Sequence, residues 1–227
     1  MEGCRISANE AVTSPNHLLR KLEQELGEGS VLAGPSISGG FLEDWPREKI
    51  GQCLAVVRPT TVQDVSRIVS LCCGSGVGIV PQGGHTGLVG GAQRQHPDCI
   101  VLSLSLLSSI REVDRDNMTA IVEGGVVLQH LQTALSEYDL EFPVSIGAQG
   151  TAQIGGLIST NAGGVQVVRH GMTGAHVQGL ELVLADGQIV SSMSGLYKDN
   201  RGPDPLRIAV GGEGAFGIVT AACLRLT

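Results

Sequence analysis

The chain has 227 residues, of which 42% are hydrophobic and 16% charged, and 33 of them are glycine. This length and composition suit one large domain or two packed lobes and exclude a disordered chain. A net charge of −7 without a lysine or arginine cluster argues against nucleic acid as a partner, and the apolar runs are too short for a membrane span.

The N-terminal segment, residues 1–50, is expected to be helical at first and extended afterwards. Leu18, Leu22 and Leu26 recur on one face, which predicts a helix over His17–Leu26. A turn-rich stretch follows this helix. The segment is therefore treated as separate from the rest of the chain, residues 51–227.

A strand–helix–strand unit is predicted next. Ala55–Val57 alternates like a strand and stops before Pro59. Thr60 is expected to cap the following helix, with Gln63 completing a capping box and Gly74 ending the helix in a left-handed conformation. A second strand then leads into the densest glycine cluster of the chain. Such a unit is typical of α/β or α+β folds.

The remainder of the chain alternates further strands with one amphipathic helix, and it shows no internal repeat. The predicted helix carries Leu128, Leu131, Leu135 and Tyr138 on one face. The predicted strands are Gly78–Pro81, Ile100–Leu104, Ala120–Val122, the two arms of a hairpin at Leu180–Leu184 and Gln188–Val190, and Ile218–Leu226.

The six cysteines are scattered, and none forms a CxxC pair, which predicts free thiols in a reducing compartment, the cytoplasm. Adjacent Cys72 and Cys73 fall in a helical pattern and are interpreted as core thiols. The first twenty residues lack the pattern of a secretory signal.

The first glycine cluster, Pro81–Gly91, directly follows a predicted strand and holds five glycines in eleven residues. Such a loop exposes backbone N–H groups, which can form a nest for a phosphate. It is neither a Walker A loop nor a dinucleotide fingerprint of the GxGxxG type.

Two further clusters follow, one over residues 147–164 and one over residues 211–220. Tight turns alone would explain any one cluster. Three in one chain favour close approach of the backbone to a large flat or phosphorylated ligand.

A set of short motifs in a fixed order resembles the FAD-binding domain of the vanillyl-alcohol-oxidase/p-cresol-methylhydroxylase family. The resemblance covers roughly residues 44–227 and is nearest to the branch of D-2-hydroxyglutarate dehydrogenase, D-lactate dehydrogenase and the glycolate oxidase flavin subunit. The motifs are Arg58-Pro59, Pro81–Gly91, Gly150–Gly156, Asn161–Gly164, Ala185–Gly187, Lys198–Asn200 and Gly214–Thr220.

The resemblance implies an α+β fold of the p-cresol-methylhydroxylase type, with two lobes and FAD in the cleft between them. The first lobe would span about residues 54–110 and the second about 111–227. By resemblance the first cluster holds the pyrophosphate, the second lines the adenosine and isoalloxazine, and the last strand meets the adenine or ribitol through its backbone. The implied FAD-binding residues are Pro81, Gly83, Gly84, His85, Thr86, Gly87, Leu88, Gly90, Gly91, Pro143, Gly147, Gly150, Thr151, Ile154, Gly155, Gly156, Asn161, Gly163, Gly164, Gly217, Ile218 and Val219.

His85 leaves two alternatives open. Some branches of the family carry a histidine in a similar Gly-Gly-His context that is bonded covalently to the flavin 8α-methyl group. A histidine hydrogen-bonded within the loop or to a phosphate is the alternative, and the rest of the loop resembles the branch that binds flavin without a covalent bond.

The implied activity is oxidation of a D-2-hydroxy acid, like 2-hydroxyglutarate or lactate, to the 2-oxo acid by hydride transfer to flavin N5. The family's substrate-binding and basic residues lie in a C-terminal domain, which is expected to be absent from this chain, so no catalytic residue is assigned. No metal site is expected, because His and Glu do not cluster. Two alternatives stay open: a non-catalytic flavin-binding subunit or remnant that acts through a separate polypeptide, and a self-sufficient reductase. The electron acceptor is left open.

Overall fold

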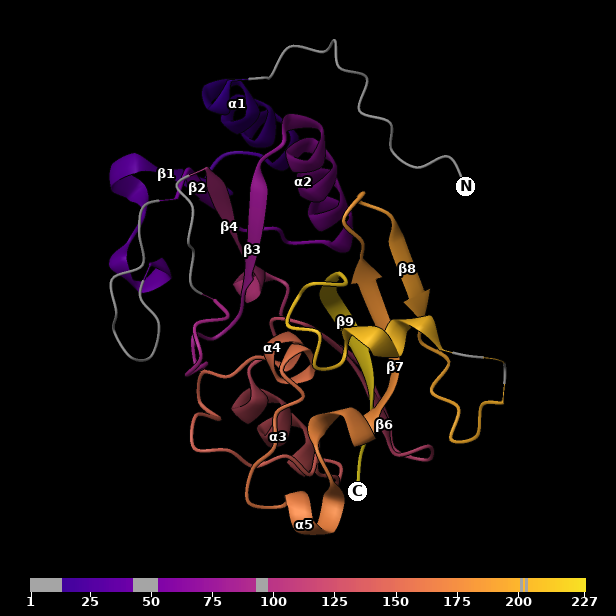
Figure 1. The fold of residues 1–227 in the computed structure, drawn as a ribbon. Helices are drawn as coiled ribbons and strands as arrows, with labels where there is room; N and C mark the ends of the chain where they lie inside the picture. Colours follow the sequence, from indigo (N-terminus) through magenta and orange to yellow (C-terminus); the bar gives the residue numbers. More distant parts are fainter. Residues whose placement is uncertain (1–13, 43–52, 93–97, 201, 203) are drawn as a thin grey trace.

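The computed structural model describes residues 14–42, 53–92, 98–200, 202 and 204–227. The predicted boundary between residues 50 and 51 lies outside them. The described chain forms two sheets with helices packed on them, and Figure 1 shows one sheet in each half of the molecule. The predicted α+β fold with two lobes is confirmed.

The first lobe is built on a four-stranded sheet in the order β1-β2-β4-β3, in which β1 runs antiparallel to β2 and the other neighbours are parallel. Leu18 and Leu22 of the first helix and Val65 and Ile68 of the second helix are buried in its core. The elements are α1 (Pro15–Leu26), β1 (Val31–Ala33), β2 (Ala55–Val57), α2 (Val62–Ser75), β3 (Gly78–Gln82) and β4 (Cys99–Ser103), with 3-10 turns at Gly34–Ser36 and Gly39–Phe41. Two elements from the N-terminal fifty residues, α1 and β1, therefore pack as part of this lobe.

The second lobe is built on a five-stranded antiparallel sheet in the order β5-β6-β9-β7-β8. Its core lies between this sheet and the helices α3 and α4. The elements are β5 (Ile110–Asp114), β6 (Thr119–Glu123), α3 (Leu128–Ser136), α4 (Ile154–Ser159), α5 (Val167–His170), β7 (Val177–Val183), β8 (Ile189–Ser192) and β9 (Ile218–Arg225), with 3-10 turns at Thr173–His176 and Pro205–Ala209. A further 3-10 turn, Leu104–Leu106, directly follows β4 of the first lobe.

The two lobes share apolar contacts. Val183 of β7 and Ile218 of β9 belong to the buried cluster of the first lobe, together with Leu104 and Leu107. A turn of the second lobe also docks on α2: the Ser66 hydroxyl donates a hydrogen bond to the Gly187 carbonyl over 2.6 Å. The Ala-Asp-Gly turn between β7 and β8 thus ties one lobe to the other.

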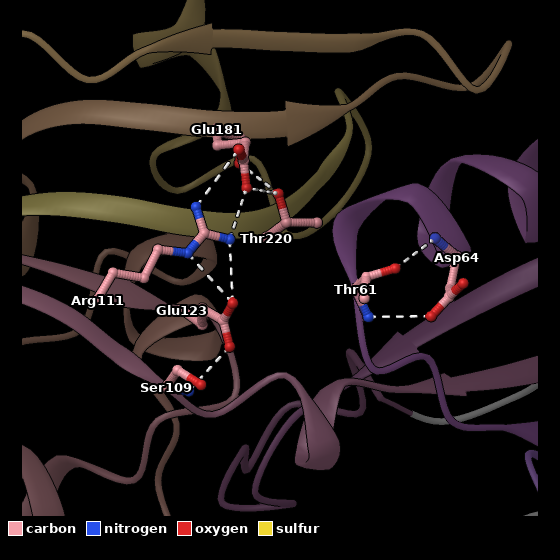
Figure 2. A network of polar contacts seen from close by, with 7 residues as sticks. All are labelled: Thr61, Asp64, Ser109, Arg111, Glu123, Glu181 and Thr220. Atoms are coloured by element: carbon pink, nitrogen blue, oxygen red, sulfur yellow. Dashed lines mark hydrogen bonds and ion pairs between the residues drawn. The ribbon is translucent and has the colours of Figure 1, made fainter.

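Both predicted ends of α2 are wrong by one or two residues. Thr61, not Thr60, is the N-cap: its hydroxyl accepts from the backbone N–H of Asp64, whose carboxylate in turn accepts from the N–H of Thr61 (Figure 2). Asp64 replaces the predicted Gln63, since an ionised carboxylate is the stronger acceptor. Gly74 continues the helix, and Gly76 adopts the left-handed cap with φ +66°.

The interpretation of the adjacent cysteines holds for one of them. Cys72 is buried in α2, and burial raises the pKa of its thiol to about 12, with a smaller contribution from Cys73. Cys73 is exposed, because it lies one helical position away from the apolar stripe. Among the described residues, no helix combines the length and apolar character needed to cross a bilayer.

Candidate functional site

The three glycine clusters, far apart in the sequence, meet where the lobes face each other. A Cβ built on Gly83 would lie 3.4 Å from Oε1 of Gln153, and one built on Gly91 would lie 3.4 Å from Oε2 of Glu213. Gly214 in turn approaches the ring of Pro81. The loop after β3 therefore touches both the second and the third cluster.

Some of these glycines are required by contacts within the protein. A side chain on Gly84 would overlap the carbonyl oxygen of Thr151, and one on Gly164 would overlap that of Ser145. A Cβ on Gly155 would come within 3.1 Å of the Gly124 carbonyl, to which the Gly155 N–H already donates over 2.7 Å. Gly84 and Gly164 admit only glycine because backbone meets backbone there, whereas a side chain on Gly155 would require a small shift of the neighbouring backbone.

Other glycines face open space. Built Cβ atoms on Gly87, Gly147 and Gly156 meet no heavy atom within 4 Å, and all three residues are exposed. None of the three has a positive φ, so neither protein packing nor backbone conformation demands glycine there.

Two hollows border the glycine clusters, and of Gly87, Gly147 and Gly156 only Gly147 lines one of them. The second-lobe hollow has a volume of about 730 Å³ and is lined by Ser145, Ile146, Gly147, Gln149, Gly163, Gly164 and Val165. The inter-lobe hollow has a volume of about 260 Å³ and is lined by residues of both lobes: Val69, Cys73, Val77, Ile79, Pro81, Val183, Leu184, Ala185, Gly214, Ala215, Gly217 and Ile218.

The remaining predicted site residues differ in how they are placed. In the first cluster, His85 adopts a left-handed conformation with φ +55°, Thr86 is half-buried, Leu88 is 68% exposed and Gly90 has φ +79°. Neither hollow is lined by Pro143, Gly150, Thr151, Ile154 or Asn161.

The side chain of Asn161 is engaged within the protein. Its Oδ1 accepts from the N–H of Gly174 over 2.8 Å, and the residue has φ +46°. On β9, Ile218 and Val219 are buried and pair with Val183 and Leu182, so these two approach any ligand mainly as part of the sheet.

Sequence reasoning missed two features of the site. Gln153, inside a quoted motif, is buried although it is polar, and its isolated polarity between Ala152 and Ile154 was the available signal. The pair Gly124-Gly125 was not singled out, yet side chains there would overlap the carbonyl oxygens of Val219 and Leu104. This pair lets β9, the helix α4 and the turn after β4 come together.

An ion network at the partly exposed face of the second-lobe sheet joins its strands (Figure 2). Nη2 of Arg111 lies 3.1 Å from carboxylate oxygens of both Glu123 and Glu181. Glu123 also accepts from the Ser109 N–H, and Glu181 accepts from the Thr220 hydroxyl over 3.0 Å. Burial alone would lower the pKa of Arg111, but the hydrogen bonds and charges of the two glutamates outweigh it and raise that pKa. The network joins β5, β6, β7 and β9 beside Gly124.

Comparison with known families identifies the kind of domain to which the three glycine clusters belong. Residues 53–192 match the model of the FAD binding domain, and this match covers the first two glycine clusters. The chain belongs to the FAD-binding domain family. Its cofactor is accordingly FAD, as the resemblance implied.

The curated relatives of this FAD-binding domain are longer proteins. D-2-hydroxyglutarate dehydrogenase of Danio rerio, mitochondrial by name, is 35% identical over 224 residues, which are 96% of this chain and 42% of the relative. D-2-hydroxyglutarate–pyruvate transhydrogenase of Saccharomyces cerevisiae is 36% identical over 190 residues, 84% of this chain and 38% of the relative. A protein of Schizosaccharomyces pombe named as a D-lactate dehydrogenase is 36% identical over 199 residues, 85% of this chain and 38% of the relative. The chain thus spans about two fifths of these relatives' length.

The solved structures confirm the fold. Alkyldihydroxyacetonephosphate synthase superposes with a TM-score of 0.82 at 19% identity, over 93% of this chain and 40% of that one. This likeness carries the two-lobed architecture and nothing about substrate.

The described residues fit FAD on two observations. Gly87, Gly147 and Gly156 leave space beside exposed backbone, which suits a ligand that approaches the main chain closely. Gln153 Oε1 is a buried acceptor without a hydrogen-bond partner, and FAD carries hydroxyl groups that could donate to it. Within the described part of the chain, no three His, Cys, Asp or Glu side chains gather as a metal site would require.

Proposed function

We propose that this chain is the FAD-binding part of an FAD-linked oxidoreductase that oxidises a D-2-hydroxy acid to the 2-oxo acid. The support is the FAD-binding domain match together with relatives named for D-2-hydroxyglutarate and D-lactate. The substrate is a small hydroxy acid of that kind.

The residues at the junction between the lobes would hold the cofactor. The apolar side chains of the inter-lobe hollow, such as Val69 and Ile79, would suit the adenine ring beside Ile218. The exposed backbone of the first cluster around Gly87 would suit the pyrophosphate, since backbone N–H groups bind anions. Gly147 and Gly164 of the second-lobe hollow would lie beside the isoalloxazine.

The chemistry divides between cofactor and protein. When bound, FAD supplies the hydride acceptor for oxidation of the substrate's hydroxyl-bearing carbon. The described residues bind and orient the cofactor. The closed glycines, whose added Cβ would meet backbone (Gly84, Gly155 and Gly164), hold the clusters together. The open glycines, whose Cβ would meet nothing (Gly87, Gly147 and Gly156), leave room for the dinucleotide. We expect the substrate contacts to lie in the part of the longer relatives that this chain does not match.

The observation that carries the proposal is the convergence of three glycine clusters whose exposed members have no protein neighbour. Purified protein should show flavin absorption bands near roughly 370 and 450 nm. Gly156→Leu adds a side chain into open space on α4 and should weaken FAD binding by about tenfold or more, because the side chain enters the space reserved for the cofactor.

The matched control is Gly74→Leu, because Gly74 is also exposed, helical and without a neighbour, but it lies on α2, outside the three glycine clusters. It should bind FAD like the original chain. Correctly folded protein that takes up no FAD would refute the proposal. So would equal FAD affinity of the two leucine variants.

The substrate class has its own test. The FAD-loaded protein is used in the form that includes any C-terminal substrate domain. D-2-hydroxyglutarate or D-lactate is added in the absence of oxygen, and the loss of flavin absorbance (bleaching) near roughly 450 nm is followed. Bleaching by the D but not the L enantiomer is expected. Bleaching by a reduced nicotinamide nucleotide instead would favour a reductase.

A further inference from the structure

Gln153 carries a buried acceptor that the fold leaves unpaired. The residue is 8% exposed, and its Oε1 has no hydrogen-bond partner. Its backbone is fixed: it bridges Val127, and its carbonyl accepts from the N–H of Leu157 in the first turn of α4. A rigid residue therefore holds an unsatisfied oxygen, at a cost that a partner would remove.

This oxygen lies directly against the first glycine cluster. Oε1 of Gln153 lies 3.4 Å from the position that a Cβ of Gly83 would take. Gly84, which follows Gly83 in the loop, packs against the backbone of Thr151 and Ala152. The acceptor and the loop thus form one rigid unit at the lobe junction.

We propose that Gln153 Oε1 accepts a hydrogen bond from a hydroxyl of bound FAD and so fixes the position of the dinucleotide along the glycine loop. The inference rests on the proposed function. The hydroxyl belongs either to the ribityl chain or to the adenosine ribose.

The polarity of the group decides which section of FAD it can face. Pyrophosphate oxygens are acceptors and anions, and a carbonyl oxygen beside them would repel them. A hydroxyl is a donor. The Oε1 atom of Gln153 therefore suits a hydroxyl of FAD better than its pyrophosphate, for which the exposed backbone around Gly87 leaves room.

Three other glutamines in the described residues have a buried Oε1 without a hydrogen-bond partner: Gln82, Gln166 and Gln178. Gln166 uses its amide nitrogen to bind Oε1 of Glu141 over 3.2 Å. Gln82 uses its amide nitrogen to bind the Phe41 carbonyl over 3.0 Å and belongs to the packing of the first lobe. Gln178 on β7 also has a buried, unpartnered Oε1, but unlike Gln153 it is not among the atoms nearest to a Cβ built on any glycine of the three clusters. Gln178 is thus a matched control.

The experiment compares the original chain with Gln153→Met and Gln178→Met. Methionine keeps the length of glutamine and removes the acceptor. The dissociation constant is measured by flavin fluorescence for FAD, for FAD lacking a ribityl hydroxyl, and for FAD with 2′-deoxyadenosine. The midpoint of thermal unfolding is measured on flavin-free protein.

Gln153→Met should weaken FAD binding by about tenfold, the loss expected for one buried hydrogen bond, while the flavin-free protein melts at an equal or higher temperature. Gln178→Met should leave FAD affinity unchanged. The original chain should lose a similar factor with one deoxy analogue, and Gln153→Met should not distinguish that analogue from FAD. Whichever analogue shows this coupling identifies the ribityl or the ribose hydroxyl.

Three results would overturn the assignment. The first is unchanged FAD affinity of Gln153→Met, and the second is a lower melting temperature of its flavin-free form, which would mean that the fold already uses the acceptor. The third is lost affinity without coupling to either hydroxyl. If Gln153→Met does not fold, the deoxy analogues on the original chain still decide, because equal affinity for all three flavins excludes a hydroxyl contact. An original chain that binds no FAD refutes the proposed function instead.

Discussion

Gly84 and Gly87 belong to one loop but serve different purposes. A side chain on Gly84 would overlap the Thr151 carbonyl, whereas one on Gly87 would meet nothing within 4 Å. The same division separates Gly164 from Gly147 in the second cluster. Glycine content alone overstates how many glycines face a ligand: the closed ones bring the clusters together, and the open ones leave room for FAD.

Gly84→Ala tests the division between closed and open glycines with the largest expected loss of stability. One added methyl group would push the first cluster off residues 151–152, and a backbone oxygen cannot rotate away as a side chain can. We expect the free energy of unfolding to fall by about 3 kcal/mol or more, measured by urea denaturation.

The partner variant in the same loop is Gly87→Ala, which should unfold at nearly the same urea concentration as the original chain. Comparable stability of the two alanine variants would show that the lobe junction can shift freely. The division into closed and open glycines would then fail.

The next largest effect concerns the strands beneath the closed glycines. Arg111→Met leaves Glu123 and Glu181 without their shared cation, although both carboxylates are largely buried. We expect a loss of about 2 kcal/mol in unfolding free energy, because two like charges then face each other. Arg115→Met removes an exposed pair with Asp139 and should change stability by less than about 0.5 kcal/mol. Equal losses would mean that the shared network of Arg111 contributes no more than an isolated surface pair.

The strands and long helices could be predicted from the sequence because their apolar spacing is local. Ala55–Val57, the α1 region and the hairpin around Asp186 were found this way. The cap of α2 was misplaced because Thr60 and Thr61 are both suitable N-caps. Only the position of the Asp64 carboxylate, which also accepts from Thr60, selects Thr61.

The site was only partly predictable for a different reason. The glycine clusters and FAD followed from motifs, but which glycine touches protein and which faces open space depends on contacts across more than sixty positions, such as Gly84 with Thr151. Gln153 escaped notice because its polarity between Ala152 and Ile154 marks it only as unusual, whereas the missing partner of its oxygen is a property of packing.

The end of α2 offers a smaller version of the same comparison. Gly76 has φ +66°, whereas its neighbour Gly74 is an exposed helical residue with open space around it. Gly76→Ala should cost about 1 kcal/mol, and Gly74→Ala should stabilise the protein by about 0.5–1 kcal/mol. Urea denaturation measures both. If Gly74→Ala were the damaging variant, the helix would end where the sequence pattern first indicated.

The smallest effect at neutral pH, and one that grows with acid, concerns His176, which is buried and packs edge-on to Phe142. Burial lowers the pKa of His176; the backbone of His170 opposes this in part, and the positive charges of Arg225 and His170 add to it. The unfolded chain therefore takes up a proton at about pH 6.5 that the folded protein refuses, so stability present above that pH is lost as the pH falls. His176→Phe lacks this proton and should show a shallower loss of unfolding free energy between pH 7 and pH 5, with the pH 8 values as the reference in which both side chains are neutral. A slope identical to that of the original chain would mean that His176 accepts its proton without unfolding the packing around it.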